Sequence, residues 1–110
     1  METIKPSQNS PIGIFDSGLG GLTVLKSLET LLPNESFIYF GDTAHVPYGT
    51  KSAETVIRYS QHIMDFFQKH ETKAVVIACN TASAVAFQHL QQLYNIPLFD
   101  VVTPSVEFAI

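Results

Sequence analysis

Four short, almost uninterrupted apolar segments recur along this chain of 110 residues, and a stretch with helical spacing separates each from the next. The apolar segments span residues 12–16, 37–40, 74–79 and 98–102. Strands that alternate with helices form βαβ units, which place the strands parallel in one sheet with right-handed crossovers. Strands that are apolar on both faces are typical of a parallel sheet covered on both sides. We therefore expect a three-layer α/β domain with a parallel four-stranded sheet flanked by helices.

The segments between these strands carry apolar residues on one helical face. We expect the second helix to begin after Ser52 as its N-cap, with Glu54 in the first turn. Residues from Pro104 onward are typical of a fourth helix that is cut off after a turn or two. The expected faces are Leu22, Leu25, Leu28 and Leu32 in the first helix, Val56, Ile57, Ser60, Ile63, Met64 and Phe67 in the second, and Ala82, Val85, Ala86, Leu90 and Leu93 in the third.

The length of the chain allows one domain. Residues 1–11 are polar, so we expect a loose or disordered leader there, followed by a domain over residues 12–110 that is truncated in its last helix. The net charge of −4 and the absence of a Lys/Arg cluster argue against binding to nucleic acid or to an anionic membrane. No stretch approaches the ~20 apolar residues of a membrane helix. A single cysteine cannot form an internal disulfide, and we expect a cytoplasmic protein.

Polar residues follow each of the first three strands at once. Asp16 and Ser17 end the first, Asp42 follows the second, and Cys79 ends the third. Ligands of open parallel sheets bind beyond the carboxyl ends of the strands, so these residues mark a candidate site. Asp42 can equally cap or brace its own loop. Tyr48 lies in the same loop, and the simplest interpretation of this residue is that it packs against the loop.

The thiol of Cys79 stands where an expected strand passes into an expected helix. The N–H groups and the dipole at such a helix start favour the thiolate, which is a base or a nucleophile. Cysteine is also among the most buried residue types, so a structural role is an equal alternative on this pattern alone. Asn80 and Thr81 are N-cap candidates, and the N–H groups of the same turn suit a carboxylate ligand.

Cofactor and metal motifs are weak in this sequence. Gly18 and Gly20 follow a strand as in a dinucleotide fingerprint, but Thr23 stands where that fingerprint has Gly or Ala. No Lys-Ser/Thr pair follows these glycines, which excludes a Walker-type phosphate loop. We expect neither cofactor nor metal, because no metal-ligand spacing links Cys79 to His45, His62, His70 or His89. His45 follows the second strand, and of the four histidines it is the candidate to line the cleft at the candidate site.

Three motifs in this order resemble the glutamate racemases of the aspartate/glutamate racemase superfamily. The first is IGIFDSGLGGLTV at residues 12–24. The second combines YFGDT at 39–43, VPYG at 46–49 and KS at 51–52. The third is ACNTAS at 78–83. The resemblance covers essentially everything after Pro11, and it implies a flavodoxin-like domain that forms one half of a two-domain racemase.

The resemblance also implies an activity, the cofactor-independent interconversion of L- and D-glutamate that supplies D-glutamate for bacterial peptidoglycan. In this family two cysteines face opposite sides of the substrate α-carbon; one removes the α-proton and the other returns one. Cys79 matches the first cysteine, and Asp16 matches an acidic residue near it and near the substrate amino group, so the resemblance implies that both are catalytic. The positions that match substrate contacts are Ser17, Tyr48, Gly49, Asn80 and Thr81.

The second domain of the family carries the opposing cysteine in a Cys-Thr-His motif, which these 110 residues lack. The resemblance therefore implies the N-terminal half of a racemase, inactive alone and missing its C-terminal domain as a partner. The surface left uncovered favours a homodimer. Two alternatives stay open, a related aspartate or other amino-acid racemase and a non-catalytic binding domain.

Overall fold

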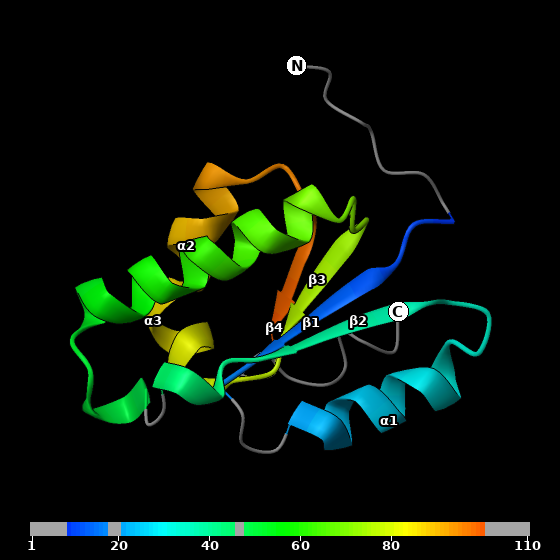
Figure 1. Ribbon diagram of the computed structural model, residues 1–110, viewed down its shortest axis with the longest axis horizontal. Coiled ribbons are helices and arrows are strands. Elements are labelled where there is room, and N and C mark those ends of the chain that lie inside the picture. Colours follow the sequence, from blue (N-terminus) through cyan, green and yellow to red (C-terminus); the bar gives the residue numbers. More distant parts are fainter. Residues whose placement is uncertain (1–8, 18–20, 46–47, 101–110) are drawn as a thin grey trace.

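The computed structural model describes residues 9–17, 21–45 and 48–100, and these form one parallel sheet with helices on both faces (Figure 1). The four strands lie in the order β2-β1-β3-β4. This confirms the expected α/β fold. The strands are β1 (Ile12–Asp16), β2 (Phe37–Gly41), β3 (Ala74–Ile77) and β4 (Leu98–Asp100), and the helices are α1 (Gly21–Leu31), α2 (Ala53–Lys69) and α3 (Asn80–Leu93), with short 3₁₀ turns η1 (Thr43–His45) and η2 (Tyr48–Thr50).

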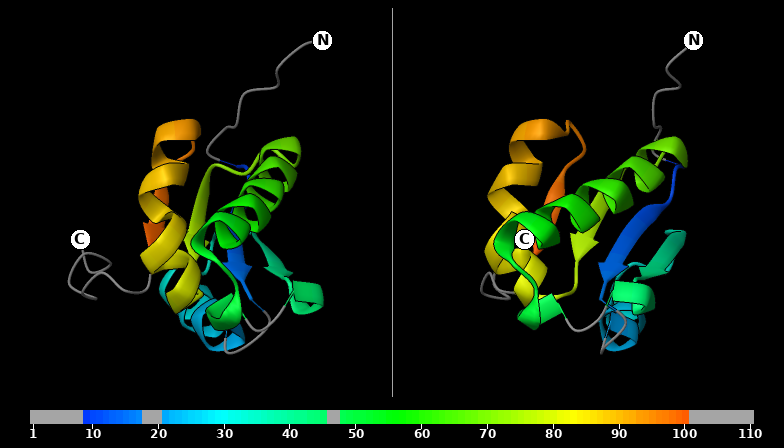
Figure 2. Two further views of the ribbon diagram at one scale, coloured as in Figure 1. Left: turned by 90° about the vertical axis from the view of Figure 1, so that its left-hand side faces the viewer. Right: turned by 60° about the vertical axis from the view of Figure 1, so that its left-hand side comes forward.

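The helices divide between the two faces of the sheet. Figure 2 shows α2 and α3 together on one face and α1 on the other. This division follows from right-handed crossovers, because the chain moves one way from β1 to β2 and the opposite way from β2 to β3 and β4. The loops after β1 and β3 therefore leave the sheet toward opposite faces, so the topological switch point of the sheet lies between these two neighbouring strands.

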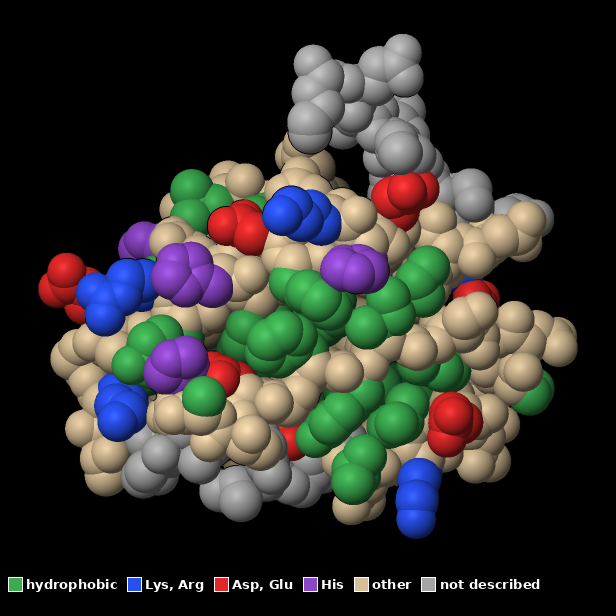
Figure 3. All heavy atoms as spheres, in the orientation of Figure 1, with side chains coloured by type: hydrophobic (Ala, Val, Ile, Leu, Met, Phe, Trp, Pro, Cys, Tyr) green, Lys and Arg blue, Asp and Glu red, His purple; other side chains and the backbone are tan. Residues whose placement is uncertain are grey.

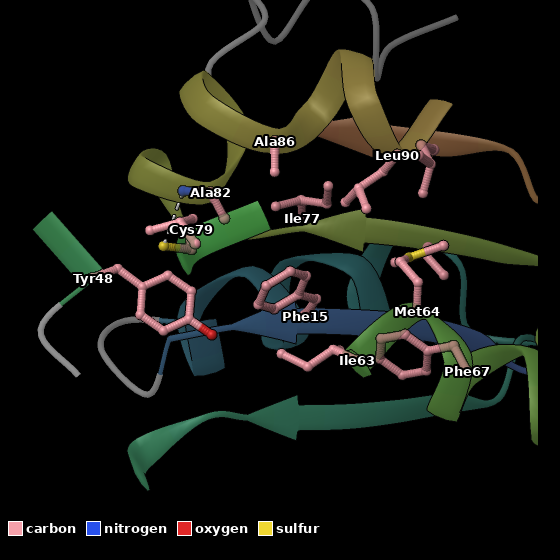
Figure 4. Packing of buried hydrophobic residues seen from close by; sticks show 13 residues of the cluster. Phe15, Tyr48, Ile63, Met64, Phe67, Ile77, Cys79, Ala82, Ala86 and Leu90 are labelled. Atoms are coloured by element: carbon pink, nitrogen blue, oxygen red, sulfur yellow. Dashed lines mark hydrogen bonds between the residues drawn. The ribbon is translucent and has the colours of Figure 1, made fainter. Parts of the chain in front are cut away.

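The main core lies between the sheet and the layer of α2 and α3 (Figure 4). Phe15 and Phe67 are fully buried there. Gly13 of β1 lets α2 approach closely, because a methyl group on Gly13 would lie 2.7 Å from Cδ1 and Cε1 of the Phe67 ring. Two buried hydroxyls in this layer are satisfied by the backbone, since Ser60 donates to the Val56 carbonyl and Thr72 to that of Phe67.

The layer of α1 is more open to solvent than the opposite layer. Leu22 and Leu31 of this helix are 57% and 66% exposed. Phe99 of β4 points to the same face as Val76, its partner across the strand pair, and is 45% exposed. Figure 3 shows hydrophobic side chains that gather in a band across the face seen in Figure 1, between α2 and α1.

The expected elements are found with shifted ends. Ser52 is the N-cap of α2, as expected, and its Oγ accepts from the Thr55 N–H at 3.1 Å. The expected third strand is two residues too long at its end, because Cys79 caps α3 instead of continuing β3. Leu32 lies just past the end of α1, and Leu93 is exposed. The loose leader, apart from its last residues, and the expected fourth helix from Pro104 lie outside the described residues.

Among the residues that the structure describes, no helix has the length and apolar character needed to cross a bilayer. Three of the histidines are exposed, and one of them, His70, is the C-cap residue of α2.

Candidate active site

The carboxyl ends of β1, β2 and β3 lie at one edge of the sheet, on either side of the switch point between β1 and β3. The Asp42 N–H donates to the Asp16 carbonyl at 2.8 Å, and the Ala78 N–H donates to the Phe15 carbonyl at 2.7 Å. These backbone bonds hold the residues that follow β2 and β3 against the end of β1. Ser17 follows β1 and Cys79 follows β3, on either side of this switch point, and both are only 7% exposed.

Cys79 is the N-cap of α3 and a member of the apolar core at the same time. Its backbone is extended, with φ −107° and ψ 122°, and its Sγ accepts from the Ala82 N–H at 3.5 Å (Figure 4). The thiol therefore points along the first turn of α3, where N–H groups are directed at it and the helix dipole favours negative charge. Cys79 is thus packed in the core, and its sulfur lies at the start of a helix.

A buried carboxylate holds the loop that follows β2. The Tyr48 hydroxyl donates to Asp42 Oδ2 at 2.5 Å, and His45 Nδ1 lies 2.8 Å from each oxygen of the same carboxylate. The His45 ring stacks on Tyr59 with centroids 3.8 Å apart. Asp42 therefore braces its loop, which was one of its two expected roles. His45 contributes to holding this loop through its contacts with Asp42 and Tyr59.

The Tyr48 side chain anchors this loop in the core. Its ring is buried and meets Phe15 edge-on at a centroid distance of 6.4 Å. Burial, the hydrogen bond to Asp42 and the Asp42 charge raise the pKa of Tyr48 far above its usual value. The hydroxyl hydrogen is thus retained and directed at Asp42.

The loop after β2 lies against the start of α3. A methyl group placed on Gly49 would lie 4.0 Å from Thr81 Oγ1, so the sequence-predicted pair Tyr48-Gly49 and the predicted residue Thr81 are neighbours. Asn80 is exposed and Thr81 is half-buried. The structure thus brings together Cys79, Thr81, Tyr48 and Gly49 on the side of the sheet that α3 covers.

Asp16 ends β1 on the other side of the sheet. Successive residues of a strand alternate between faces, and Phe15 packs in the core under α2 and α3. The Asp16 side chain therefore points to the face of α1. It is fully buried, and its Oδ2 accepts from the Tyr39 hydroxyl at 2.7 Å. The sequence prediction placed Asp16 and Cys79 at one edge, and the structure adds that their side chains reach this edge from opposite faces.

Tyr39 was missed by the sequence analysis. The available signal was its position two residues before Gly41, which places both residues on the same face of β2. Gly41 pairs with Asp16 across the two strands, so Tyr39 is a diagonal neighbour of this carboxylate. The chemical groups of the site are therefore a thiol at a helix start, two buried carboxylates and two tyrosines that donate to them. Among the described residues, no three His, Cys, Asp or Glu side chains gather as a metal site.

The link between Tyr48 and Asp42 predicts how stability depends on pH. We expect Tyr48→Phe to lower the free energy of unfolding at pH 7 by about 1.5–3 kcal/mol, since a hydrogen bond to a charged group is lost. Because the folded pKa is raised, the Tyr48 contribution is fully present below pH ~10 and is lost as the pH rises further. The loss amounts to about 1.4 kcal/mol per pH unit while only the unfolded tyrosine is ionised.

Urea denaturation of the chain from pH 7 to pH 12 measures this dependence. The curves of the wild-type chain and of Tyr48→Phe should converge above pH ~10. Tyr39 and Tyr94, whose pKa values are also raised, are present in both proteins and cancel in the comparison. Parallel curves over the whole range would contradict the prediction.

Known proteins resemble this chain in both sequence and structure. The model of the Asp/Glu/Hydantoin racemase family matches residues 12–110. Among curated proteins, the glutamate racemase of Geobacter metallireducens is 58% identical over 98 residues, which are 89% of this chain and 36% of that protein. The glutamate racemase of Neisseria meningitidis is 50% identical, covering 100% of this chain and 40% of that protein.

Solved structures agree with these relatives. The glutamate racemase of Thermus thermophilus in complex with β-chloro-D-alanine superposes with a TM-score of 0.84 at 51% identity, over 92% of this chain and 40% of that one. The enzyme of Francisella tularensis in complex with D-glutamate superposes with a TM-score of 0.83 at 49% identity, over 92% of this chain and 39% of that one. The chain thus spans well under half the length of the proteins it matches.

Proposed function

Because the chain belongs to the Asp/Glu/Hydantoin racemase family, we propose that it forms one half of the active site of a glutamate racemase, which interconverts L- and D-glutamate without a cofactor. Its residues 12–110 are the N-terminal racemase domain in this proposal, and a C-terminal domain is its partner. The product D-glutamate serves bacterial peptidoglycan and cell shape, and the enzyme works in the cytoplasm.

The position of Cys79 is the observation that supports this proposal most. The thiol caps α3 at the switch point between β1 and β3, beside Thr81 and the loop with Tyr48 and Gly49. Removal of an α-proton requires a base near the substrate and fixed donors for the charge that develops on the carboxylate. A thiolate and the first turn of a helix supply both from adjacent residues.

The remaining residues take up the groups of glutamate in this proposal. Asn80 and Thr81 hold a carboxylate at the start of α3, where the N–H groups and dipole favour an anion. Asp16 holds the substrate ammonium, because a carboxylate attracts a cation. Its negative charge would disfavour a thiolate nearby, so its contribution comes from binding the ammonium group. Ser17 contacts the substrate beside Asp16, and Gly49 does so from the loop after β2. Cys79 removes the α-proton on one face, and a second cysteine from the partner domain returns a proton on the other.

The direct test joins this chain to the remaining residues of the Geobacter metallireducens relative, a protein called the two-domain enzyme below. We expect it to racemise D- and L-glutamate, as followed by circular dichroism or by chiral chromatography. Aspartate and other amino acids are assayed in parallel. A preference for aspartate would favour the related-racemase alternative, and inactivity on every amino acid would leave the binding-domain alternative.

The chain alone is expected to bind glutamate weakly and not to racemise it, since one thiol serves one face of the α-carbon. Exposed apolar side chains, among them Leu22, Leu31 and Phe99, favour a two-fold homodimer. Sedimentation velocity and a D-glutamate assay on the same sample check both statements. Robust turnover by a monomer would overturn the two-base proposal.

A further inference from the structure

We infer that Tyr39 is a positioning residue for Asp16, whose carboxylate it holds in the orientation in which it meets the substrate ammonium. This inference rests on the proposed function and assigns Tyr39 a part in it. The hydroxyl of Tyr39 donates to Asp16 Oδ2 at 2.7 Å, and Asp16 is fully buried. A carboxylate with one oxygen held by a directed donor cannot rotate freely about its last bond, so the direction of Oδ1 is set as well.

The register of the sheet places this donor. Asp16 is the last residue of β1 and pairs with Gly41, the last residue of β2. Tyr39 precedes Gly41 by two residues and therefore shares its face and that of Asp16. The donor is thus carried by a strand of the sheet and not by a loop, which favours a fixed geometry at the site.

Gly41 makes the space for this contact. A methyl group on Gly41 would lie 3.1 Å from Cε2 and 3.2 Å from the hydroxyl oxygen of Tyr39. These distances are shorter than ordinary van der Waals contact, so a methyl group on Gly41 would push the Tyr39 ring aside by a few tenths of an ångström. The hydrogen bond between Tyr39 and Asp16 therefore depends on the absence of a side chain at Gly41.

The hydroxyl remains a donor at any pH at which the site would work. Burial, the hydrogen bond to Asp16 and the charge of Asp16 raise the pKa of Tyr39 to about 12. The hydrogen that it directs at Asp16 is therefore retained near neutral pH. In this arrangement Tyr39 does not touch the substrate and acts only through the carboxylate.

Kinetics of the two-domain enzyme test this role with a matched control. Tyr39→Phe removes only the hydroxyl, and we expect it to lower kcat for D-glutamate by about 10- to 100-fold, with KM changed by less than about threefold. Tyr94→Phe removes an equivalent bond, because the Tyr94 hydroxyl donates to Asp65 Oδ1 at 2.7 Å, between α3 and α2. It should leave kcat within about twofold of the wild-type value.

A second variant keeps the hydroxyl and moves it. Gly41→Ala pushes the Tyr39 ring by a few tenths of an ångström, and it should lower kcat in the same direction as Tyr39→Phe but by a smaller factor. Combining either variant with Asp16→Asn should add no further loss to that of Asp16→Asn alone, since both act through this carboxylate. Urea denaturation of each variant shows that it is folded at the assay temperature.

The outcomes separate the inference from the proposed function. An active wild-type enzyme in which Tyr39→Phe turns over like Tyr94→Phe, or shows only a raised KM, would overturn the positioning role alone. A wild-type enzyme without activity on any amino acid would overturn the proposed function and with it this role. A selective loss of kcat in Tyr39→Phe and Gly41→Ala, absent in Tyr94→Phe, supports the inference.

Discussion

In the two-domain enzyme, Cys79→Ser is expected to lower kcat for glutamate racemisation by at least about 100-fold, the lower end of what a positioned acid or base contributes. A serine hydroxyl at this position is far too weak a base to remove the α-proton. The assay is D-glutamate turnover monitored by circular dichroism. Turnover close to the wild-type value would show that Cys79 is a packing residue and nothing more.

The same substitution is expected to preserve the fold. Sγ of Cys79 caps α3 through the Ala82 N–H at 3.5 Å, and serine is among the preferred N-cap residues. The free energy of unfolding of Cys79→Ser should therefore equal that of the wild type or exceed it by up to about 1 kcal/mol. Cys79→Ala is the matched control, because it removes the cap as well as the base. It should lose both turnover and about 1 kcal/mol of stability.

Gly13→Ala is expected to lower the free energy of unfolding by about 1–3 kcal/mol. The added methyl group would overlap the Phe67 ring at 2.7 Å. This ring cannot swing aside easily, because it is fully buried and packs edge-on against Phe40 and Phe66 at centroid distances of 6.4 and 5.5 Å. Urea denaturation of the chain measures the loss.

Gly49→Ala is the control for this prediction. A methyl group at Gly49 meets only Thr81 Oγ1 at 4.0 Å, and the unfolded chain loses entropy in the same way as for Gly13→Ala. Its stability should change by less than about 1 kcal/mol. Equal losses in the two variants would show that the effect comes from the removal of glycine and not from overlap with Phe67.

The architecture could be predicted from the sequence because the strands of a buried parallel sheet are apolar and short, and because the helical faces repeat between them. The residues at which the strands end were harder to predict. Cys79 continues the apolar run of β3, and only the capping bond to Ala82 shows that it belongs to the helix. The solvent exposure of Leu22 and Leu31 was also not predictable, because the spacing of a helix does not show how much of its face is covered.

The candidate site was predictable as a set of residues at one sheet edge, since polar residues follow three neighbouring strands. Its internal contacts were not. The sequence gives no reason why Asp42 binds Tyr48 and His45, while Asp16 binds Tyr39 from the other face. Which side chain binds which carboxylate depends on the twist of the sheet and on the space that Gly41 leaves, and both arise only when the chain is folded.

The capping bond between Ala82 and Cys79 has a consequence for how the site can be observed. An ionised sulfur is a stronger acceptor than a neutral thiol, so the bond tightens when the thiolate forms and relaxes when the sulfur takes up a proton. The amide resonance of Ala82 in a nitrogen-15 NMR spectrum is therefore a built-in reporter of the charge on Cys79. It allows the protonation of the sulfur to be followed in solution without a substrate, an inhibitor or a chemical label.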